Sequence, residues 1–323
     1  MKNIIRIVAS ATLLLAAATA PALAQQFPTK PIRIIVPAPA AGPFDRIMRP
    51  LAQEMAVVLK QPVVVENRPS AGNIVGTQAG AAAAPDGYTL TMTGMLNTIA
   101  AGMYDKVPFD IVSDFAHVGV IGGGAQWLVV RGDAGIHTFQ ELVAQARREP
   151  GKVNYASSGL GSTGHLVMEQ LQRATGTTMT HVPYKGGAPA LQDVLSGVVS
   201  VLVIPPNAAM QHVKADKLKV LAVSSATRMA SVPEVTTFAE LGLRQLTVSS
   251  WVGLSAPKGT PQAVVARIHA ALEQALANPA LKAQLVAEGM EPMQGTPQQY
   301  TQLVKSDTER WGQLTRSLNI KAN

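Results

Sequence analysis

The chain of 323 residues is 47% hydrophobic and 15% charged, carries a formal net charge of +7 and contains no cysteine. Its length favours two domains, and the absence of cysteine excludes both a disulfide framework and a lipid attached through cysteine. The positive charge is modest and dispersed, without the basic stripe and stacking aromatics typical of nucleic-acid binding, so we expect no nucleic-acid partner. This charge suits a small anionic ligand better.

The N-terminal segment has the pattern of a cleaved export signal. Lys2 and Arg6 precede an apolar stretch at residues 7–18, followed by the small-residue sequence ALA at 22–24, where a signal peptidase cuts. The apolar stretch is too short to cross about 30 Å of hydrocarbon, and no later apolar run reaches about 20 residues. We therefore expect a signal peptide covering the first 24 residues, cleavage after Ala24, and no membrane insertion of the mature chain.

Short β-branched runs then alternate with Ala-rich helical patterns, which predicts parallel sheets with helices on their faces. We expect strands at residues 32–36, 63–66, 89–93, 128–131, 153–156, 180–182, 201–204, 218–223 and 246–254. Thr138 and Glu141 form a capping box that begins a helix. Thr260-Pro261 and Thr296-Pro297 each place a hydroxyl cap before a first-turn proline, so we expect helix from about Pro261 onward.

Two segments, 126–130 and 249–254, carry Trp127 and Trp251 beside apolar residues. The chain between them has a complete α/β alternation of its own. Core packing of the two tryptophans is one interpretation. The other is that the segments are paired crossings, which let two lobes hinge over a shared cleft.

The segment from Asn154 to Leu166 reads NYASSGLGSTGHL, an apolar run followed by a loop of Gly, Ser and Thr and then by helical periodicity. Such a loop turns backbone N–H groups and hydroxyls toward the positive end of the following helix, which suits an anion. Gly159, Gly161 and Gly164 also match a dinucleotide fingerprint, but the acidic residue that this fingerprint requires about 20 positions on is absent. We favour a small-anion cradle and expect no cofactor, with a structural glycine turn as the alternative.

Similar loops follow four other predicted strands, at residues 37–45, 94–97, 183–187 and 205–207. Ligands of open α/β sheets bind beyond the carboxyl ends of the strands, so these loops are expected to line one pocket. Few of their side chains are ionisable, which leaves backbone dipoles, hydroxyls and ordered water to hold the anion. Asp45 is alternatively the cap of a helix through Leu59, and Lys185 an exposed lysine beside a glycine turn.

Catalytic and metal-binding patterns are poor. The six histidines show no metal-ligand spacing, so we expect no metal. The sequence Gly161-Ser162-Thr163-Gly164-His165 allows a serine hydrolase with Ser162 as nucleophile and His165 as base, but it departs from the G-x-S-x-G elbow. On the first helical turn, His165 could instead donate to a bound carboxylate or have a structural role. We expect no enzyme.

The chain resembles the Bug family of periplasmic solute receptors, the substrate-binding components of tripartite tricarboxylate transporters. The matching motifs span the mature chain and read KPIRIIVPAPAAGPFD from Lys30, QPVVVENRPSAGNIVGT from Gln61, AAAAPDGYTL from Ala81, VNYASSGLGSTGHL from Val153, HVPYKGGAPALQDVLSG from His181, KLKVLAVSSATR from Lys217 and WVGLSAPKGTP from Trp251.

This resemblance implies an α/β, two-lobed type II periplasmic-binding-protein fold, each lobe a mixed sheet flanked by helices, joined by two crossing strands. Lobe 1 would comprise residues 25–127 and 251–323, and lobe 2 residues 128–250. The protein would be a periplasmic monomer that closes on a small organic carboxylate and delivers it to membrane transporter subunits. The alternatives are a sensor that presents its solute to a membrane signalling partner, and the exported hydrolase.

Carried over by motif and loop position, the candidate ligand-binding residues are Pro39, Gly42, Asp45, Thr93, Met95 and Asn97 in lobe 1, and Ser157, Gly161, Ser162, Thr163, His165, Tyr184, Lys185, Gly186 and Asn207 in lobe 2. The first loop departs from the family, which usually has Gly where Ala41 stands. Alanine lacks easy access to positive φ and adds a methyl group, and Phe44 adds apolar bulk. We therefore expect a narrower or more apolar pocket, for an aromatic or short monocarboxylate.

Overall fold

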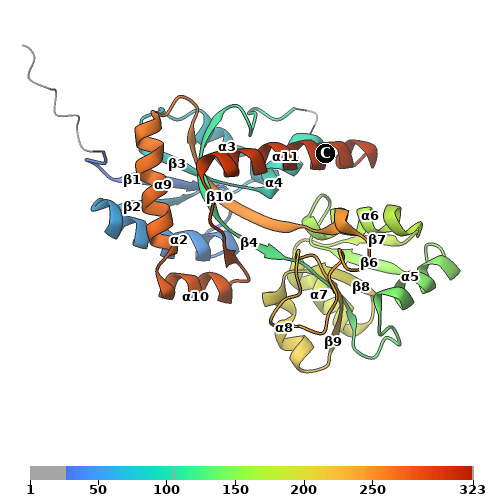
Figure 1. Ribbon diagram of the computed structural model, residues 1–323. Helices are drawn as coiled ribbons and strands as arrows, with labels where there is room; N and C mark the ends of the chain where they lie inside the picture. Colours follow the sequence, from blue (N-terminus) through green and yellow to red (C-terminus); the bar gives the residue numbers. More distant parts are fainter. Residues whose placement is uncertain (1–26, 105, 322–323) are drawn as a thin grey trace, which may run out of the picture.

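The computed structural model describes residues 27–104 and 106–321, so the expected signal peptide and its cleavage site lie outside the described residues. Figure 1 shows two α/β bodies connected by long strands. One body is built on a six-stranded sheet of order β11-β4-β10-β3-β1-β2, and the other on a five-stranded sheet of order β7-β6-β8-β5-β9. We call the first body, with α2–α4 and α9–α11, lobe 1, and the second, with α5–α8, lobe 2.

Lobe 1 is a mixed sheet, because β1 pairs in parallel with β2 and β3 whereas β10 runs antiparallel to β3 and β4. Its elements are β1 (Ile32–Val36), α2 (Pro43–Leu59), β2 (Val63–Asn67), η1 (Ala71–Asn73), α3 (Ile74–Ala81), β3 (Thr89–Gly94), α4 (Met95–Met103), β4 (Phe115–Ala125), β10 (Ser249–Pro257), α9 (Gln262–Leu276), α10 (Pro279–Ala287), β11 (Glu291–Pro292) and α11 (Pro297–Ser317). The apolar stripe of α2, including Met48 and Leu51, packs with Ile34 of β1 in one fully buried cluster.

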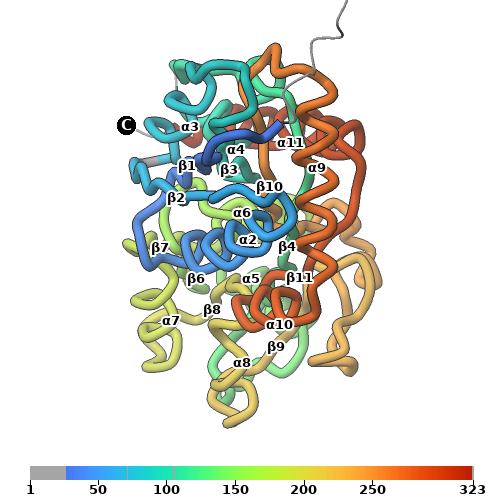
Figure 2. The backbone as a smooth tube through the Cα atoms, turned by 90° about the vertical axis from the view of Figure 1, so that its left-hand side faces the viewer, coloured from blue at the N-terminus to red at the C-terminus, as the bar shows by residue number. Residues whose placement is uncertain are grey.

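Lobe 2 is also a mixed sheet, with β6 parallel to β7 and β8 and β5 antiparallel to β8 and β9. Its elements are β5 (Trp127–Arg131), α5 (Phe139–Arg148), β6 (Asn154–Ser157), α6 (Thr163–Thr175), β7 (Thr180–Pro183), α7 (Gly187–Ser196), β8 (Val201–Ile204), α8 (Pro206–Lys214), β9 (Leu218–Val223) and η2 (Arg244–Leu246). Figure 2 shows α8 at the end of lobe 2 farthest from β1.

The two crossing strands lie side by side. β4 passes through Gln126 into β5, while β10 pairs with β4 from Ser249 opposite Ala125 to Pro257 opposite Phe115. The predicted crossings are therefore confirmed. Both tryptophans are also core residues: Trp127 is fully buried, and the buried Trp251 donates its indole N–H to the Asp307 carboxylate at 2.6 Å.

One long strand escaped prediction. β4 contains Gly119 and the run from Gly122 to Gly124, and glycine weakens the β-strand signal. Here the glycines are required by close packing, since a Cβ on Gly122 would lie 2.6 Å from the Glu291 carbonyl oxygen of β11. The predicted start of the strand at residues 246–254 was also wrong, because Leu246 belongs to the 3₁₀ turn η2 and strand β10 begins at Ser249.

The helix caps were only partly predicted. The capping box at Thr138 and the hydroxyl cap at Thr296 are confirmed, each hydroxyl accepting the N–H three residues on. Thr260 is not a cap, because its hydroxyl donates to the Pro257 carbonyl at 2.7 Å and Pro261 occupies the N-cap position. The C-terminal region also contains α10 and the short strand β11 between its two predicted helices. Across the described residues, no helix combines the length and apolarity needed to cross a membrane.

Candidate functional site

Five helices begin just beyond the carboxyl end of a strand, in the order predicted for the binding loops. α2 and α4 follow β1 and β3 in lobe 1, and α6, α7 and α8 follow β6, β7 and β8 in lobe 2. These strands are parallel within each sheet, so the loops share one sheet edge. The first N–H groups of a helix have no intrahelical acceptor and carry its positive dipole end. Each lobe therefore presents several amide-rich helix ends on one side.

The glycine loop between β6 and α6 leads into a helix N-terminus, as the prediction of an anion cradle requires. Gly159 and Gly161 adopt φ values of 130° and 73°, which favour glycine. Ser162 is the N-cap of α6, and its hydroxyl accepts the N–H of His165 at 3.4 Å. The amides of Thr163 and Gly164, at the first two helical positions, lack intrahelical acceptors. The backbone of this loop is therefore consistent with the predicted anion cradle.

His165 has a different position from the one expected of a ligand donor. It is 3% exposed, and its Nδ1 accepts the N–H of Gly161 at 3.0 Å. Burial lowers the pKa of His165 to about 4, with a smaller contribution from nearby His181. The imidazole is therefore neutral at pH 7 and supports the loop. The imidazole Nδ1 bonds Gly161, whereas Ser162 bonds the backbone of His165, so the geometry also lacks the Ser–His pair of a hydrolase.

Two more predicted contacts of lobe 2 are engaged inside the lobe. Ser157 is fully buried, and its hydroxyl lies 2.7 Å from His181 Nε2 and 3.0 Å from the Gly159 carbonyl oxygen. The Tyr184 hydroxyl donates to the Asp193 carboxylate at 2.5 Å, and burial together with this bond raises the pKa of Tyr184 to about 12.

The second loop of lobe 2, between β7 and α7, is open to solvent. Lys185 is exposed, as the structural alternative for this residue predicted. Gly186 is the N-cap of α7 with a φ of 118°, a conformation that side chains rarely adopt. Gly187, which is half-buried, begins the helix and supplies a second helix N-terminus in lobe 2.

The carboxylate of Asp45 is fully engaged by its own lobe. Asp45 is the third residue of α2 and not its cap, since Gly42 is the N-cap. The carboxylate accepts from the Ala41 N–H at 2.8 Å, the Asn67 amide at 2.9 Å and the Arg49 guanidinium at 2.8 Å. Burial raises the pKa of Asp45, but these three hydrogen bonds outweigh it and leave the pKa below its ordinary value. Its charge therefore stabilises the first loop.

The first loop itself is a tight turn in which the Gly42 N–H donates to the Pro39 carbonyl at 3.3 Å. Ala41 occupies a left-handed conformation with a φ of 59°. The conformation expected to be difficult for alanine is thus present and held by hydrogen bonds on both sides of the residue, from Ala41 N–H to Asp45 and from Arg46 to the Ala41 carbonyl. Phe44 packs against the apolar core of lobe 1.

The remaining predicted residues of lobe 1 are buried structural residues. The Thr93 hydroxyl lies 2.7 Å from both the Ser255 hydroxyl and the Tyr300 hydroxyl. The side chain of Asn97 accepts the Gly94 N–H and donates to Thr77, each at 2.9 Å. Met95 is 2% exposed and belongs to the core. The spacing of Gly94 and Asn97, typical of a helix N-terminus, is the signal that could have identified this role.

Two predicted residues, Asn207 and Gly161, lie at contacts between the lobes, but their partners are residues that the sequence did not single out. The Asn207 amide at the start of α8 donates to the backbone carbonyl of Glu288 at 2.7 Å, and the Glu288 carboxylate forms an ion pair with Arg46 at 2.9 Å. A Cβ on Gly161 would lie 2.1 Å from the sulfur of Met103, so the end of α4 touches the glycine loop. Both views place α10 next to α8. These contacts join residues that are far apart in the sequence, so only the tertiary structure identifies them.

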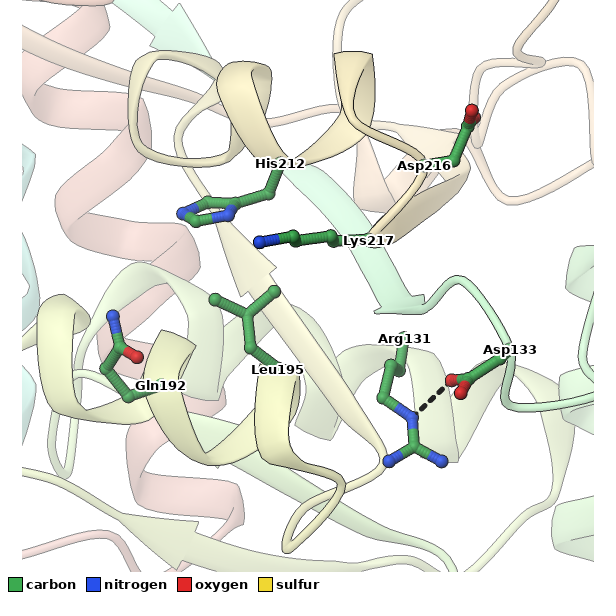
Figure 3. A pocket seen from close by; sticks show the side chains of 7 residues that line it. All are labelled: Arg131, Asp133, Gln192, Leu195, His212, Asp216 and Lys217. Atoms are coloured by element: carbon green, nitrogen blue, oxygen red, sulfur yellow. Dashed lines mark ion pairs between the residues drawn. The ribbon is translucent and has the colours of Figure 1, made fainter.

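A cavity of about 560 Å³ lies elsewhere on lobe 2 (Figure 3). Its lining residues are Arg131, Asp133, Gln192, Leu195, His212, Asp216 and Lys217, none of them a predicted site residue. Five of these residues come from the C-terminal halves of α7 and α8 or from the turn after α8. The carboxyl ends of helices favour cations, and the lining carries both charge signs. This cavity therefore does not coincide with the helix ends suited to an anion.

Two mixed sheets, joined by paired crossing strands and bordered by helix N-termini, define a two-lobed solute-binding protein. The family model described as "Tripartite tricarboxylate transporter family receptor" matches residues 47–320. The chain belongs to this family, whose members are receptors and not enzymes, so the hydrolase alternative is wrong.

Three known proteins illustrate the relationship. Protein BugT of Bordetella pertussis is 34% identical over 323 residues, covering 99% of both chains. A Rhodopseudomonas palustris protein solved with adipate is 29% identical, with a TM-score of 0.77 over 91% of this chain and 99% of that one. MatC of the same organism, solved with malate, is 29% identical, with a TM-score of 0.74 over 89% and 99%. The resemblance to Bug receptors and the fold class are thus confirmed.

Proposed function

We propose that this protein is a periplasmic receptor that binds a small organic carboxylate between its lobes and delivers it to the membrane subunits of a tripartite tricarboxylate-type transporter. The protein would be a monomer in which lobe 1 comprises residues 25–127 and 251–323 and lobe 2 residues 128–250. These bounds differ from the two sheets at Trp127, which pairs in the lobe 2 sheet, and at Ser249 and Ser250, which pair in the lobe 1 sheet. The family membership supports the transport role, and the relatives solved with malate and adipate support the ligand class.

The groups proposed to hold the ligand are those that the fold leaves available. In lobe 2 these are the first amides of α6, the α7 N-terminus with Gly186 and Lys185, and the hydroxyl protons of Ser162 and Thr163, whose oxygens accept from His165 and Ser250. Backbone amides at a helix N-terminus donate to an anion and align a dipole with it. Lobe 1 would contribute the turn at Pro39 and Gly42 and the first amides of α2 and α4.

One contact carries the proposal. The hydroxyl of Ser250, on the crossing strand β10, donates to the Thr163 hydroxyl at 3.2 Å. This hydrogen bond places the N-terminus of α6 against the strand that joins the two lobes. A ligand held there is within reach of both lobes, which is the requirement for closure on a solute.

The proposal is tested by adding a negative charge at the N-terminus of α6 while keeping the N-cap hydrogen bond. Ser162→Asp keeps a side-chain oxygen at the N-cap and favours the helix dipole, so the folded state should be as stable as the wild type. The added negative charge should weaken carboxylate binding at least 100-fold, because juxtaposed like charges cost several kcal/mol, on the order of 3 kcal/mol here.

Thr138→Asp is the matched control, since it makes the same charge change at the N-cap of α5 in the same lobe. Isothermal titration calorimetry with malate, adipate, citrate and benzoate, after a thermal-shift screen of the wild type, measures the effect. Equal affinities for Ser162→Asp and the wild type would place the ligand elsewhere. If none of these carboxylates raises the melting temperature of the wild type, the proposed ligand class is wrong.

A further inference from the structure

Three rings stack inside lobe 2, next to the glycine loop. The rings of His165 from α6 and His181 from β7 have centroids 4.0 Å apart and planes within 11°. Tyr155 from β6 continues the stack, 4.8 Å from His181. Tyr155 is fully buried and His165 is 3% exposed. Each imidazole also makes a polar contact with the loop, which an apolar packing residue could not make.

The polar contacts of the pair converge on the loop. His165 Nδ1 accepts the Gly161 N–H at 3.0 Å, so Nδ1 carries no proton and the imidazole proton resides on Nε2. His181 Nε2 lies 2.7 Å from the Ser157 hydroxyl, which in turn contacts both the carbonyl and the N–H of Gly159. Both glycines with positive φ are therefore held in place through a histidine.

The surroundings favour uncharged imidazoles. Glu169 Oε1 is 3.9 Å from His165 Nε2, too far for a hydrogen bond, and it accepts instead from the Tyr155 hydroxyl at 2.6 Å and from Gln172 at 3.1 Å. The other elements packed on α6 add little charge, since β8 is entirely apolar and Arg244 of η2 is exposed. Burial lowers the pKa of both histidines, and two cations 4 Å apart would repel each other.

We propose that His165 and His181 are positioning residues of the binding loop: as neutral imidazoles they hold residues 157–162 in the shape that receives the carboxylate. This inference rests on the proposed function of the loop. If His165 Nδ1 became protonated, its N–H would face the Gly161 N–H. Because two donors cannot form a hydrogen bond with each other, the loop would have to change its conformation. Neither imidazole need touch the ligand.

His165→Asn and His165→Ala separate this role from simple packing. The Asn oxygen can replace Nδ1 as acceptor for the Gly161 N–H and does not titrate, whereas Ala removes the acceptor. At pH 7 we expect affinity for adipate or malate to be within about threefold of wild type for Asn and at least tenfold weaker for Ala. His137→Asn, at an exposed histidine of the same lobe, should match the wild type.

The pH profile gives a second readout. The ratio of the wild-type Kd to the His165→Asn Kd cancels the titration of the ligand itself. With a pKa of His165 of about 4, this ratio should rise as pH falls from 7, reaching at least about twofold at pH 4, where half of the imidazole is protonated. A constant ratio, or Asn binding as weakly as Ala at pH 7, would overturn the positioning role.

Nuclear magnetic resonance of the wild type tests the geometry without a ligand. The ¹⁵N shifts of His165 should show an unprotonated Nδ1 at pH 7, and the Gly161 amide shift should titrate with the same midpoint as the imidazole. A protonated Nδ1 at pH 7, or a Gly161 amide insensitive to pH, contradicts the inference even if carboxylates bind. Absence of carboxylate binding with these shifts as expected contradicts only the proposed function.

Discussion

Ser224 and Gln126 bond each other reciprocally at the point where the chain crosses between the lobes. The Ser224 N–H donates to the Gln126 carbonyl at 2.9 Å, and the Gln126 N–H donates to the Ser224 hydroxyl at 2.8 Å. The same hydroxyl donates to the Val248 carbonyl at 2.6 Å, just before the second crossing strand. One buried serine thus joins both crossings, so under the proposed closure it lies at the point where the lobes would hinge.

Replacing Ser224 by Ala should destabilise the protein. The change leaves the Gln126 N–H and the Val248 carbonyl without their partner in a buried region, a loss of about 1–3 kcal/mol. Urea unfolding followed by circular dichroism measures it. Ser225→Ala, at the neighbouring serine whose hydroxyl bonds the Thr227 carbonyl at a more exposed place, should change stability by less than about 0.5 kcal/mol. Equal effects of the two changes would show that the hinge contact adds no stability.

Gly161→Ala should weaken both folding and ligand binding. Its φ of 73° is strained for alanine, and the new methyl group would displace the Met103 side chain. Gly176→Ala is the control, because it has a similar φ of 62° and open space at its Cβ. We expect Gly161→Ala to be less stable than Gly176→Ala by about 1 kcal/mol. In a Met103→Ala background the loss of stability caused by Gly161→Ala should fall to that of Gly176→Ala, because this comparison cancels the loss of Met103 from the core. If the Met103 change leaves the difference intact, the contact between α4 and the loop is not its cause.

Ala41→Gly should stabilise the protein. Alanine at a φ of 59° costs roughly 1–2 kcal/mol relative to its preferred conformations, and the added entropy of glycine in the unfolded chain offsets roughly 0.5–1 kcal/mol of the gain. A net gain of about 0.5–1 kcal/mol is therefore expected from thermal and urea unfolding. Ala40→Gly, at the neighbouring position without a positive φ, should instead lower stability, and a gain there as well would remove the strain argument.

His117 should make the fold sensitive to acid. It is 4% exposed, its Nδ1 lies 3.0 Å from the Ser255 hydroxyl, and burial lowers the pKa of His117 to about 4. The unfolded chain, with a histidine pKa of about 6.5, binds more protons than the folded chain between these values. The stability that depends on neutral His117 is thus complete above pH 6.5, is lost as pH falls to 4, and is constant below, a change on the order of 3 kcal/mol.

The free energy of unfolding, measured at several pH values, tests whether stability falls between pH 6.5 and 4 as predicted. His117→Gln should lower stability at pH 7 but flatten the loss between pH 6.5 and 4. His137→Gln, at an exposed histidine, should keep the wild-type slope. A His117→Gln slope equal to that of the wild type would show that His117 is not one of the groups responsible.

Several features could be predicted because they depend on near neighbours in the chain. The alternation of β-branched and Ala-rich runs predicted the strands of both sheets except β4 and β11, and the capping box at Thr138 is a contact across three residues. The glycine loop before α6 was also recognisable, since positive φ at Gly161 and an N-cap at Ser162 are local properties. The strand β4 was missed because its glycines carry no local strand signal.

The direction and partner of each polar side chain depended on the tertiary structure. Thr93 bonds Tyr300, 207 positions away in the sequence, and Asn207 bonds the Glu288 carbonyl 81 positions away. From sequence, a polar residue at the end of a strand is equally suited to a ligand and to a distant hydrogen-bond partner. Only the packing of the folded chain decides between these two roles, because a buried polar group must find an acceptor or donor wherever the fold brings one. For this reason the sequence determined the fold class and located the loops proposed to bind the ligand, whereas the tertiary structure decided that His165, Asp45 and Asn97 support those loops from within.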